Sequence, residues 1–183
     1  ECAVHHPSIN KAVEALQWAT DKAGIVPYDE DNLQGHLRYV QLQVERKTGK
    51  ICLTLVWNAE TLKETHPAMT RLTKALKSQE PDLWHSMWCH CNDGWGNAIF
   101  SRHPSRWFLI NGPTYLKEPM ATGGKGYLYY TPTVFRQGNS EGFDSISLDV
   151  ASKIPPGSKV CELYAGVGVL GLTALNYHAA RGR

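Results

Sequence analysis

The chain has 183 residues, 42% of them apolar, and its 19 basic and 17 acidic residues give a formal net charge of +2. This composition favours a globular protein with a sizeable core, and it excludes a membrane-spanning chain because no apolar run approaches the roughly 20 residues that cross a bilayer. The small net charge means that any contact with nucleic acid must be local, and five cysteines without framework spacing or a signal peptide favour reduced thiols in an intracellular protein, cytoplasmic or organellar.

Two segments repeat apolar side chains at the spacing of a helix. Residues 7–22 predict the first helix, with Ser8 as its expected N-cap and Gly24 as its stop. Residues 67–79 predict the second helix, and Pro81 lies beyond its expected end. The side chains expected on the buried face are Ile9, Ala12, Val13, Leu16 and Ala19 in the first helix, and Met69, Leu72, Ala75 and Leu76 in the second.

Five segments have the composition or the alternation of strands. Residues 37–45 and 51–57 flank a Lys-Thr-Gly-Lys turn, and they predict an antiparallel hairpin. Further short strands are predicted over residues 84–89, 106–111 and 128–131, with glycine- and proline-bearing loops between them. One helix, two strands, one helix and more strands indicate an α+β layer.

A glycine turn follows near the end of the chain. Residues 160–164 predict a short buried strand, after which Gly166 and Gly168 allow a tight turn into a helix. Glu162 lies four residues before the first glycine, and this acid-x-x-x-Gly-x-Gly spacing suits S-adenosylmethionine, which has no pyrophosphate to neutralise. The same residues spell Gly166-x-Gly168-x-x-Gly171, the dinucleotide fingerprint, so a nicotinamide-dependent oxidoreductase is an alternative, as is a simple packing turn.

A second motif distinguishes between these interpretations. Residues 127–139 read Tyr-Leu-Tyr-Tyr-Thr-Pro-Thr-Val-Phe-Arg-Gln-Gly-Asn and precede the glycine turn. The two segments together resemble the radical-free class of S-adenosylmethionine-dependent RNA uracil-5-methyltransferases, in which Pro-x-x-Phe-x-Gln-x-Asn precedes Asp-Leu-Tyr/Phe-Cys-Gly-x-Gly. The matching positions are Pro132, Phe135, Gln137 and Asn139, followed by Glu162, Leu163, Tyr164, Ala165, Gly166 and Gly168.

The resemblance implies an α/β protein of two domains. Residues 1–118 would form an α+β central domain. Residues 119–183 would form the incomplete first part of a Rossmann-like class I methyltransferase domain, beginning with one strand-turn-helix unit. The glycine-rich residues 119–126 are the expected hinge between the two. The implied cofactor is S-adenosylmethionine, and the implied partner is tRNA or ribosomal RNA.

The resemblance also assigns a cofactor site. The amide of Gln137 would hydrogen-bond the methionine portion of the cofactor, or else cap the following helix. Glu162 would order the turn or accept from the cofactor's ammonium group. Val169 departs from the family, which often has asparagine after the second glycine. The expected cofactor-binding residues are Gln137, Glu162, Tyr164, Gly166, Gly168 and Val169.

A turn at residues 92–97 carries the candidate RNA contact. Asn, Asp and Gly tolerate left-handed backbone there, and Trp95 would stand on the tip of the turn. Its ring would stack on an RNA base, or it would fold back onto the sheet. Basic side chains lie around this turn and in the Pro-x-x-Phe-x-Gln-x-Asn segment, residues 132–139, which we call the glutamine motif. They would bind RNA phosphates or simply form a solvated face. The candidate RNA-binding residues are Trp95, Arg102, Arg106 and Arg136.

Neither metal binding nor catalysis is assigned to this chain. Cys2 resembles the last iron-sulfur ligand of cluster-bearing family members, whose other three cysteines lie upstream. Cys89 and Cys91 would share one face of a strand while His90 points away, so no zinc site is expected.

In the family, the nucleophile is a cysteine in a Ser-Cys-Asn-Pro-like loop far downstream of the glycine turn, and the chain stops at Arg183. The chain is therefore expected to be a piece of an enzyme, inactive alone. A non-catalytic RNA-binding or scaffold fragment is the alternative.

Overall fold

The computed structural model describes residues 5–96, 98–101, 103–123 and 126–182. The chain divides into two compact units, Glu1–Thr114 and Tyr115–Arg183, whereas the predicted division fell after residue 118. In the described ranges, no helix is both long and apolar enough to cross a membrane.

The first unit contains a mixed four-stranded sheet. Its strands are β1 (Leu37–Val44), β2 (Ile51–Trp57), β3 (Trp84–Cys91) and β4 (Trp107–Asn111), and they lie in the order β1-β2-β3-β4. The predicted β1–β2 hairpin is confirmed, because the two strands pair antiparallel. β2 and β3 pair in parallel, and β4 returns antiparallel to β3.

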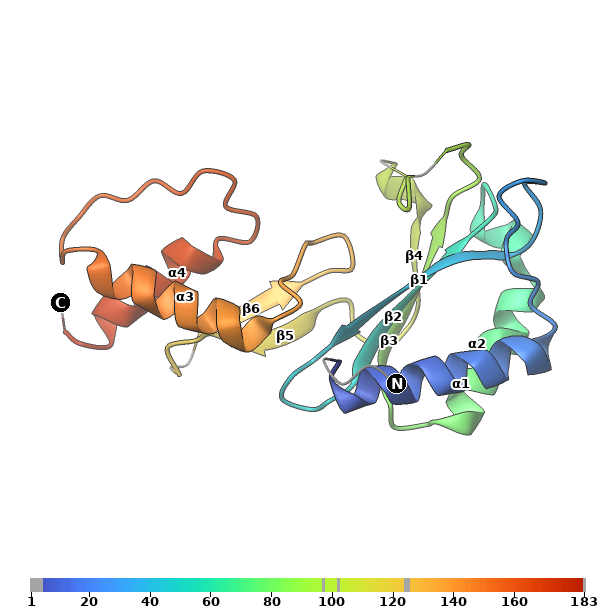
Figure 1. The fold of residues 1–183 in the computed structure, drawn as a ribbon, viewed down its shortest axis with the longest axis horizontal. Helices are drawn as coiled ribbons and strands as arrows, with labels where there is room; N and C mark the ends of the chain where they lie inside the picture. Colours follow the sequence, from blue (N-terminus) through green and yellow to red (C-terminus); the bar gives the residue numbers. More distant parts are fainter. Residues whose placement is uncertain (1–4, 97, 102, 124–125, 183) are drawn as a thin grey trace. The chain divides into compact units, whose positions relative to one another are not determined.

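Two helices, α1 (Pro7–Ala23) and α2 (Ala68–Gln79), lie on one side of this sheet (Figure 1). Short 3-10 turns, η1 (Leu62–Thr65) and η2 (Pro104–Arg106), precede α2 and β4. Both predicted helices are confirmed. The N-cap of α1 is His6 rather than Ser8, because the His6 ring accepts the Ser8 backbone N–H at 3.2 Å while Pro7 occupies the first helical position.

The core of the first unit lies between the helices and the sheet. The whole stripe predicted for α2 is buried. In α1, Ala12, Leu16 and Ala19 are buried as expected, but Val13 is exposed, and Ala15 faces the core in its place. The main residues of this core are Leu16, Ile51, Leu53, Leu55, Trp57, Met69, Leu72, Leu76, Met87, Cys89 and Cys91.

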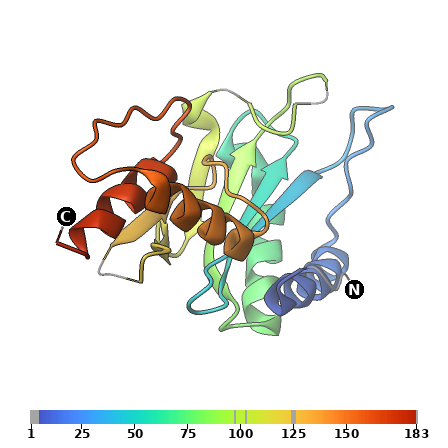
Figure 2. The ribbon, with the colours of Figure 1, turned by 60° about the vertical axis from the view of Figure 1, so that its left-hand side comes forward.

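The second unit pairs a hairpin with two helices. β5 (Leu116–Pro119) and β6 (Tyr127–Tyr130) form an antiparallel hairpin. The predicted hinge over residues 119–126 is therefore mostly the turn of this hairpin, although Gly124 and Lys125 lie outside the described residues. Helices α3 (Ser140–Lys153) and α4 (Val169–Ala179) pack against each other (Figure 2).

The strand predicted over residues 160–164 is wrong. This segment is irregular coil between α3 and α4, and Val160, Leu163 and Tyr164 are exposed. Figures 1 and 2 show the connection between α3 and α4 as an arc of coil. A strand needs neighbours that pair its backbone groups, and the strands in the described part of the chain belong to the β1–β4 sheet or to the β5–β6 hairpin. The apolar sequence is present, but it has no pairing partner.

Candidate functional site

The glycine turn before α4 has the backbone conformation that its sequence predicts. Gly166 and Gly168 are left-handed, with φ of 58° and 76°, and Gly168 is the N-cap of α4. A Cβ at Gly166 would meet nothing within 4 Å, so the backbone there is open to a ligand. Tyr164 is also left-handed (φ 56°), although it carries a Cβ, and its side chain is fully exposed. Strain of this kind is concentrated at functional sites.

The carboxylate of Glu162 holds the start of α4. It accepts a hydrogen bond at 2.9 Å from the backbone N–H of Gly171, which belongs to the first turn of the helix. The first N–H groups of a helix have no partner inside the helix, and the N-terminus favours a negative charge. A Cβ at Gly171 would lie 2.8 Å from the same carboxylate oxygen. Gly171, the third glycine of the dinucleotide fingerprint, is therefore explained by its contact with Glu162, and no bound pyrophosphate is needed to account for it.

The glutamine motif leads directly into α3. Asn139 is the N-cap of this helix, and its side chain accepts the Gly142 N–H at 2.9 Å. The alternative that Gln137 caps the helix is therefore wrong. Gln137 is exposed, and its backbone carbonyl accepts from the Ser140 hydroxyl at 3.4 Å. Phe135 is exposed as well, whereas Pro132 is buried.

Arg136 has a structural partner. Its guanidinium donates to the Glu118 carboxylate at 2.9 Å and lies 4.8 Å from the centre of the Tyr130 ring. Glu118 is only 2% exposed, and a carboxylate buried in this way needs a paired cation. Arg136, a candidate RNA contact, therefore has its charge paired with Glu118 and joins residues 132–139 to the β5–β6 hairpin.

In the first unit, the turn after β3 projects its tryptophan. Trp95 is 90% exposed, so the alternative in which it folds back onto the sheet is wrong. Arg106 forms an ion pair with Asp93 in this turn. That hydrogen bond lowers the pKa of Asp93 and raises the pKa of Arg106. Arg102 lies outside the described residues.

Sequence reasoning missed the groups that hold this turn in place. Arg38 of β1 donates to its backbone carbonyls, and Asn92 bonds across it. His90 is fully buried, stacks on Trp107 at 4.2 Å between ring centres, and accepts the Ser101 N–H at 2.8 Å. Burial, aided by the charge of Arg106, lowers the pKa of His90 to about 4, so the ring is neutral at pH 7.

The cysteines give no metal centre within the described ranges. Cys89 and Cys91 face the core with their sulfur atoms 3.9 Å apart, and His90 lies on the opposite face of β3, as predicted. The Cys91 thiol raises the pKa of Cys89, while the hydrogen bond between them lowers the pKa of Cys91. No group of three metal-ligating side chains occurs among the described residues. Cys2, the iron-sulfur candidate, lies outside them.

Proteins of similar sequence carry the name RNA methyltransferase. An uncharacterized RNA methyltransferase of Protochlamydia amoebophila is 34% identical over 174 residues, which cover 94% of this chain and 44% of the relative. An uncharacterized RNA methyltransferase of Geobacter sulfurreducens is 27% identical over 173 residues, covering 93% of this chain and 33% of that protein. The chain therefore spans less than half the length of these curated relatives. No family model matches it.

A solved structure shares the fold. The crystal structure of Pyrococcus abyssi tRNA (uracil-54, C5)-methyltransferase in complex with S-adenosyl-L-homocysteine aligns with a TM-score of 0.72 and 20% sequence identity. The alignment covers 100% of this chain and 39% of the archaeal chain. At this identity the likeness shows the fold alone, an α/β arrangement with a mixed sheet.

Proposed function

Because the chain is similar in sequence to RNA methyltransferases over nearly its whole length, we propose that it is part of an S-adenosylmethionine-dependent RNA methyltransferase. The second unit is then the opening of the methyltransferase domain, and the first unit is the central domain. The observation that carries the proposal is the left-handed glycine turn, ordered by Glu162 at the start of α4.

The residues of the turn fit this cofactor. Open space around Gly166 lets a ligand approach the backbone, and the ring of Tyr164 is free to lie against it. Glu162 is already bonded to Gly171, so we assign it to ordering the turn. The exposed amide of Gln137 is free to bind the methionine portion through donor and acceptor. Gly168 and Val169 complete the proposed site. When bound, the cofactor supplies an electrophilic methyl group.

Uridine C5 is the proposed position of methylation, on tRNA or ribosomal RNA. It is supported by the resemblance of residues 127–139 to the uracil-5-methyltransferase motif. That reaction needs a thiolate to add to C6 of the base and a general base to remove the C5 proton. Neither group is assigned among the described residues, so we expect the 183-residue chain to bind the cofactor without transferring a methyl group.

Calorimetric titration with S-adenosylhomocysteine tests the proposal. The chain should bind it saturably, and Gln137→Ala should weaken binding roughly 2- to 10-fold, the net value of one lost hydrogen bond. Gln17→Ala removes an exposed amide from α1 and is the matched control. A folded chain that binds no S-adenosylhomocysteine contradicts the cofactor site and favours a non-catalytic RNA-binding or scaffold role. Binding of NADH in its place would favour the oxidoreductase alternative.

A further inference from the structure

Trp95 is the most exposed of the six tryptophans. It stands on the turn over residues 92–96, directly after β3. A large aromatic ring left in water forgoes the gain of burial, which for aromatic side chains involves about 150–250 Å² of surface. Exposed aromatic rings of this kind stack on the bases of single-stranded nucleic acid.

The turn beneath Trp95 is fixed by one guanidinium. Nη1 of Arg38 donates to the carbonyl oxygens of Asn92 and Gly94, both at 2.8 Å, and Nη2 donates to that of Gly96 at 3.4 Å. The guanidinium in turn lies 4.5 Å from the centre of the Tyr28 ring. Three carbonyls that flank Trp95 therefore converge on a rigid fork from another strand, so the backbone that presents the ring is ordered before any ligand arrives.

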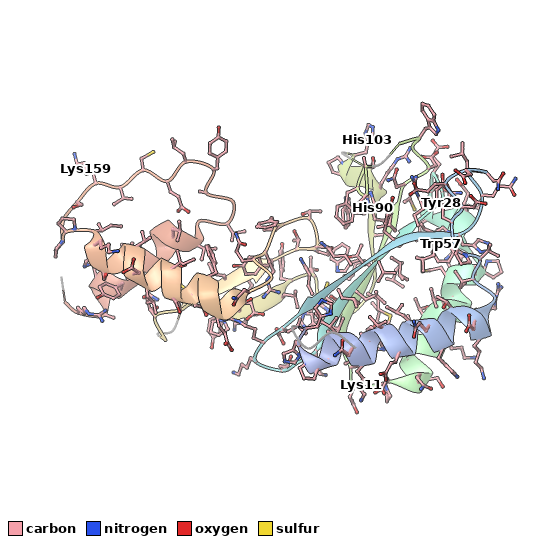
Figure 3. The ribbon with its side chains drawn as sticks, viewed as in Figure 1. Lys11, Tyr28, Trp57, His90, His103 and Lys159 are labelled. Carbon is pink, nitrogen blue, oxygen red and sulfur yellow. The ribbon has the colours of Figure 1, made fainter. Side chains whose placement is uncertain are left out.

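The side chain of Asn92 also stabilises the turn through hydrogen bonds. It is 4% exposed, and its side-chain oxygen accepts the Gly94 N–H at 3.1 Å. Its amide nitrogen donates to the carbonyls of Ala98 at 2.8 Å and Ile99 at 3.1 Å. In the segment that follows, the Phe100 ring packs edge-on against the buried His90 ring, which is labelled in Figure 3, and the Ser101 N–H donates to this ring. A preorganised platform loses little conformational entropy on binding.

Charges around the turn are nearly balanced. Asp93 is paired with Arg106, and the carboxylates of Glu60 and Glu64 lie close enough to act on this pair. A contact made by the described residues of this turn would therefore depend on the face of the ring, because these residues hold no excess of positive charge for phosphates.

We propose that Trp95 is a stacking platform for an unpaired base of single-stranded RNA, held in position by Arg38. The RNA partner comes from the proposed function, but the residues of this site belong to the first unit, whereas those of the cofactor turn belong to the second. Arg38 acts through the turn, so it is a positioning residue. Stacking on an unpaired base is worth roughly 5- to 150-fold in affinity, and it is tolerant of sequence.

Anisotropy titrations of the full chain with a fluorescein-labelled oligouridylate test the proposal, with an RNA duplex as the second probe. Trp95→Ala should weaken binding of the single strand by roughly 5- to 150-fold and leave duplex binding unchanged. Trp95→Phe should restore much of the loss. The slope of log affinity against log salt should stay the same, because no phosphate contact is removed. Trp18→Ala, which removes the exposed ring next to Lys22 on α1, is the matched control and should have no effect.

A double-mutant cycle tests the positioning role of Arg38. Arg38→Lys keeps the charge but loses the fork, so it should weaken binding in the wild-type background and have little further effect in Trp95→Ala. Circular dichroism verifies that each variant is folded. The proposal is overturned if Trp95→Ala binds the single strand as tightly as wild type, if Trp18→Ala loses as much, or if the salt slope changes. The proposal is also overturned if the wild-type chain binds S-adenosylhomocysteine but not single-stranded RNA. That result would favour a protein as the partner of this turn.

Discussion

The carboxylate of Glu162 and the backbone N–H of Gly171 are joined by a hydrogen bond of 2.9 Å across the glycine turn. The bond uses a helical N–H that has no partner within α4, and the glycine leaves room for the carboxylate at 2.8 Å from where a Cβ would lie. Two positions of the motif are thus coupled. The position of the Glu162 carboxylate requires a residue without a side chain at Gly171, and the Gly171 N–H in turn binds that carboxylate.

Gly171→Ala should separate cofactor affinity from stability. The new methyl group would displace the end of the flexible Glu162 side chain, while the helix gains up to about 1 kcal/mol in propensity. We expect the free energy of unfolding to change by about 1 kcal/mol or less, and affinity for S-adenosylhomocysteine to fall roughly two- to five-fold, the value of a charge at a helix N-terminus. Urea unfolding and calorimetry measure the two quantities. If the coupling holds, adding Glu162→Ala to Gly171→Ala has little further effect, whereas additive losses would refute it.

Arg136→Ala should strongly destabilise the second unit. It leaves the buried Glu118 carboxylate without its guanidinium, a change that typically costs about 3–5 kcal/mol. Arg136→Lys should lose less because it keeps the charge. Lys153→Ala breaks an ion pair of 2.6 Å with Asp149 that is exposed on α3, and it should cost only about 0.5 kcal/mol. Urea unfolding compares the three variants, and equal losses for Arg136→Ala and Lys153→Ala would disprove the buried role.

The elements that the sequence predicts correctly depend on local pattern. The α2 stripe follows from helical spacing, and the β1–β2 hairpin follows from alternation around a short turn. β5 was missed because its sequence, Leu-Lys-Glu-Pro, resembles a loop. Its burial comes from pairing with β6 and from Arg136, a contact 18 residues away. The strand expected over residues 160–164 fails for the opposite reason, because a local apolar pattern cannot supply the neighbouring strands.

The residues of the candidate sites were likewise predictable only where their role depends on local sequence. Gly166 and Gly168 were predictable because a left-handed turn needs glycine locally. Arg38 was not predictable, since its partners in the turn lie 54 to 58 residues further along the chain. His90 was considered only as a metal ligand, although burial between aromatic rings gives it a different role. Buried polar residues on strands give no periodic signal that distinguishes them from surface residues.

His90 should make stability depend on pH. Its pKa is about 4 in the folded chain and 6.5 in the unfolded reference, so only the unfolded state binds the proton between these values. Stability is full above about pH 6.5 and should fall by about 3 kcal/mol as the pH drops to 4. The Asp93 pKa is lowered from 3.8, so loss of its contribution begins below this window.

The measurement for His90 is urea unfolding at a series of pH values. His90→Gln keeps an acceptor for the Ser101 N–H but has no proton to bind, so its stability should fall much less than that of the wild type between pH 6.5 and 4. The exposed Glu64, whose pKa is lowered from 4.5, leaves a small dependence in both proteins. The comparison concerns the slope and not the absolute stability, which the smaller side chain lowers by itself. A wild-type slope that persists in His90→Gln would assign the pH dependence to other groups.

Cys161 should be the reactive thiol of the described chain. It is exposed in the segment before the glycine turn, whereas Cys52, Cys89 and Cys91 are buried. In a Cys2→Ser background, a thiol reagent should therefore label one sulfur rapidly and three more only after unfolding in urea. Because Cys161 adjoins Glu162, saturating S-adenosylhomocysteine should slow the rapid reaction, and Cys161→Ser should abolish it. A rapid reaction that persists in Cys161→Ser would show that a core thiol is accessible, and a rate unchanged by a ligand that binds would place the cofactor away from this segment.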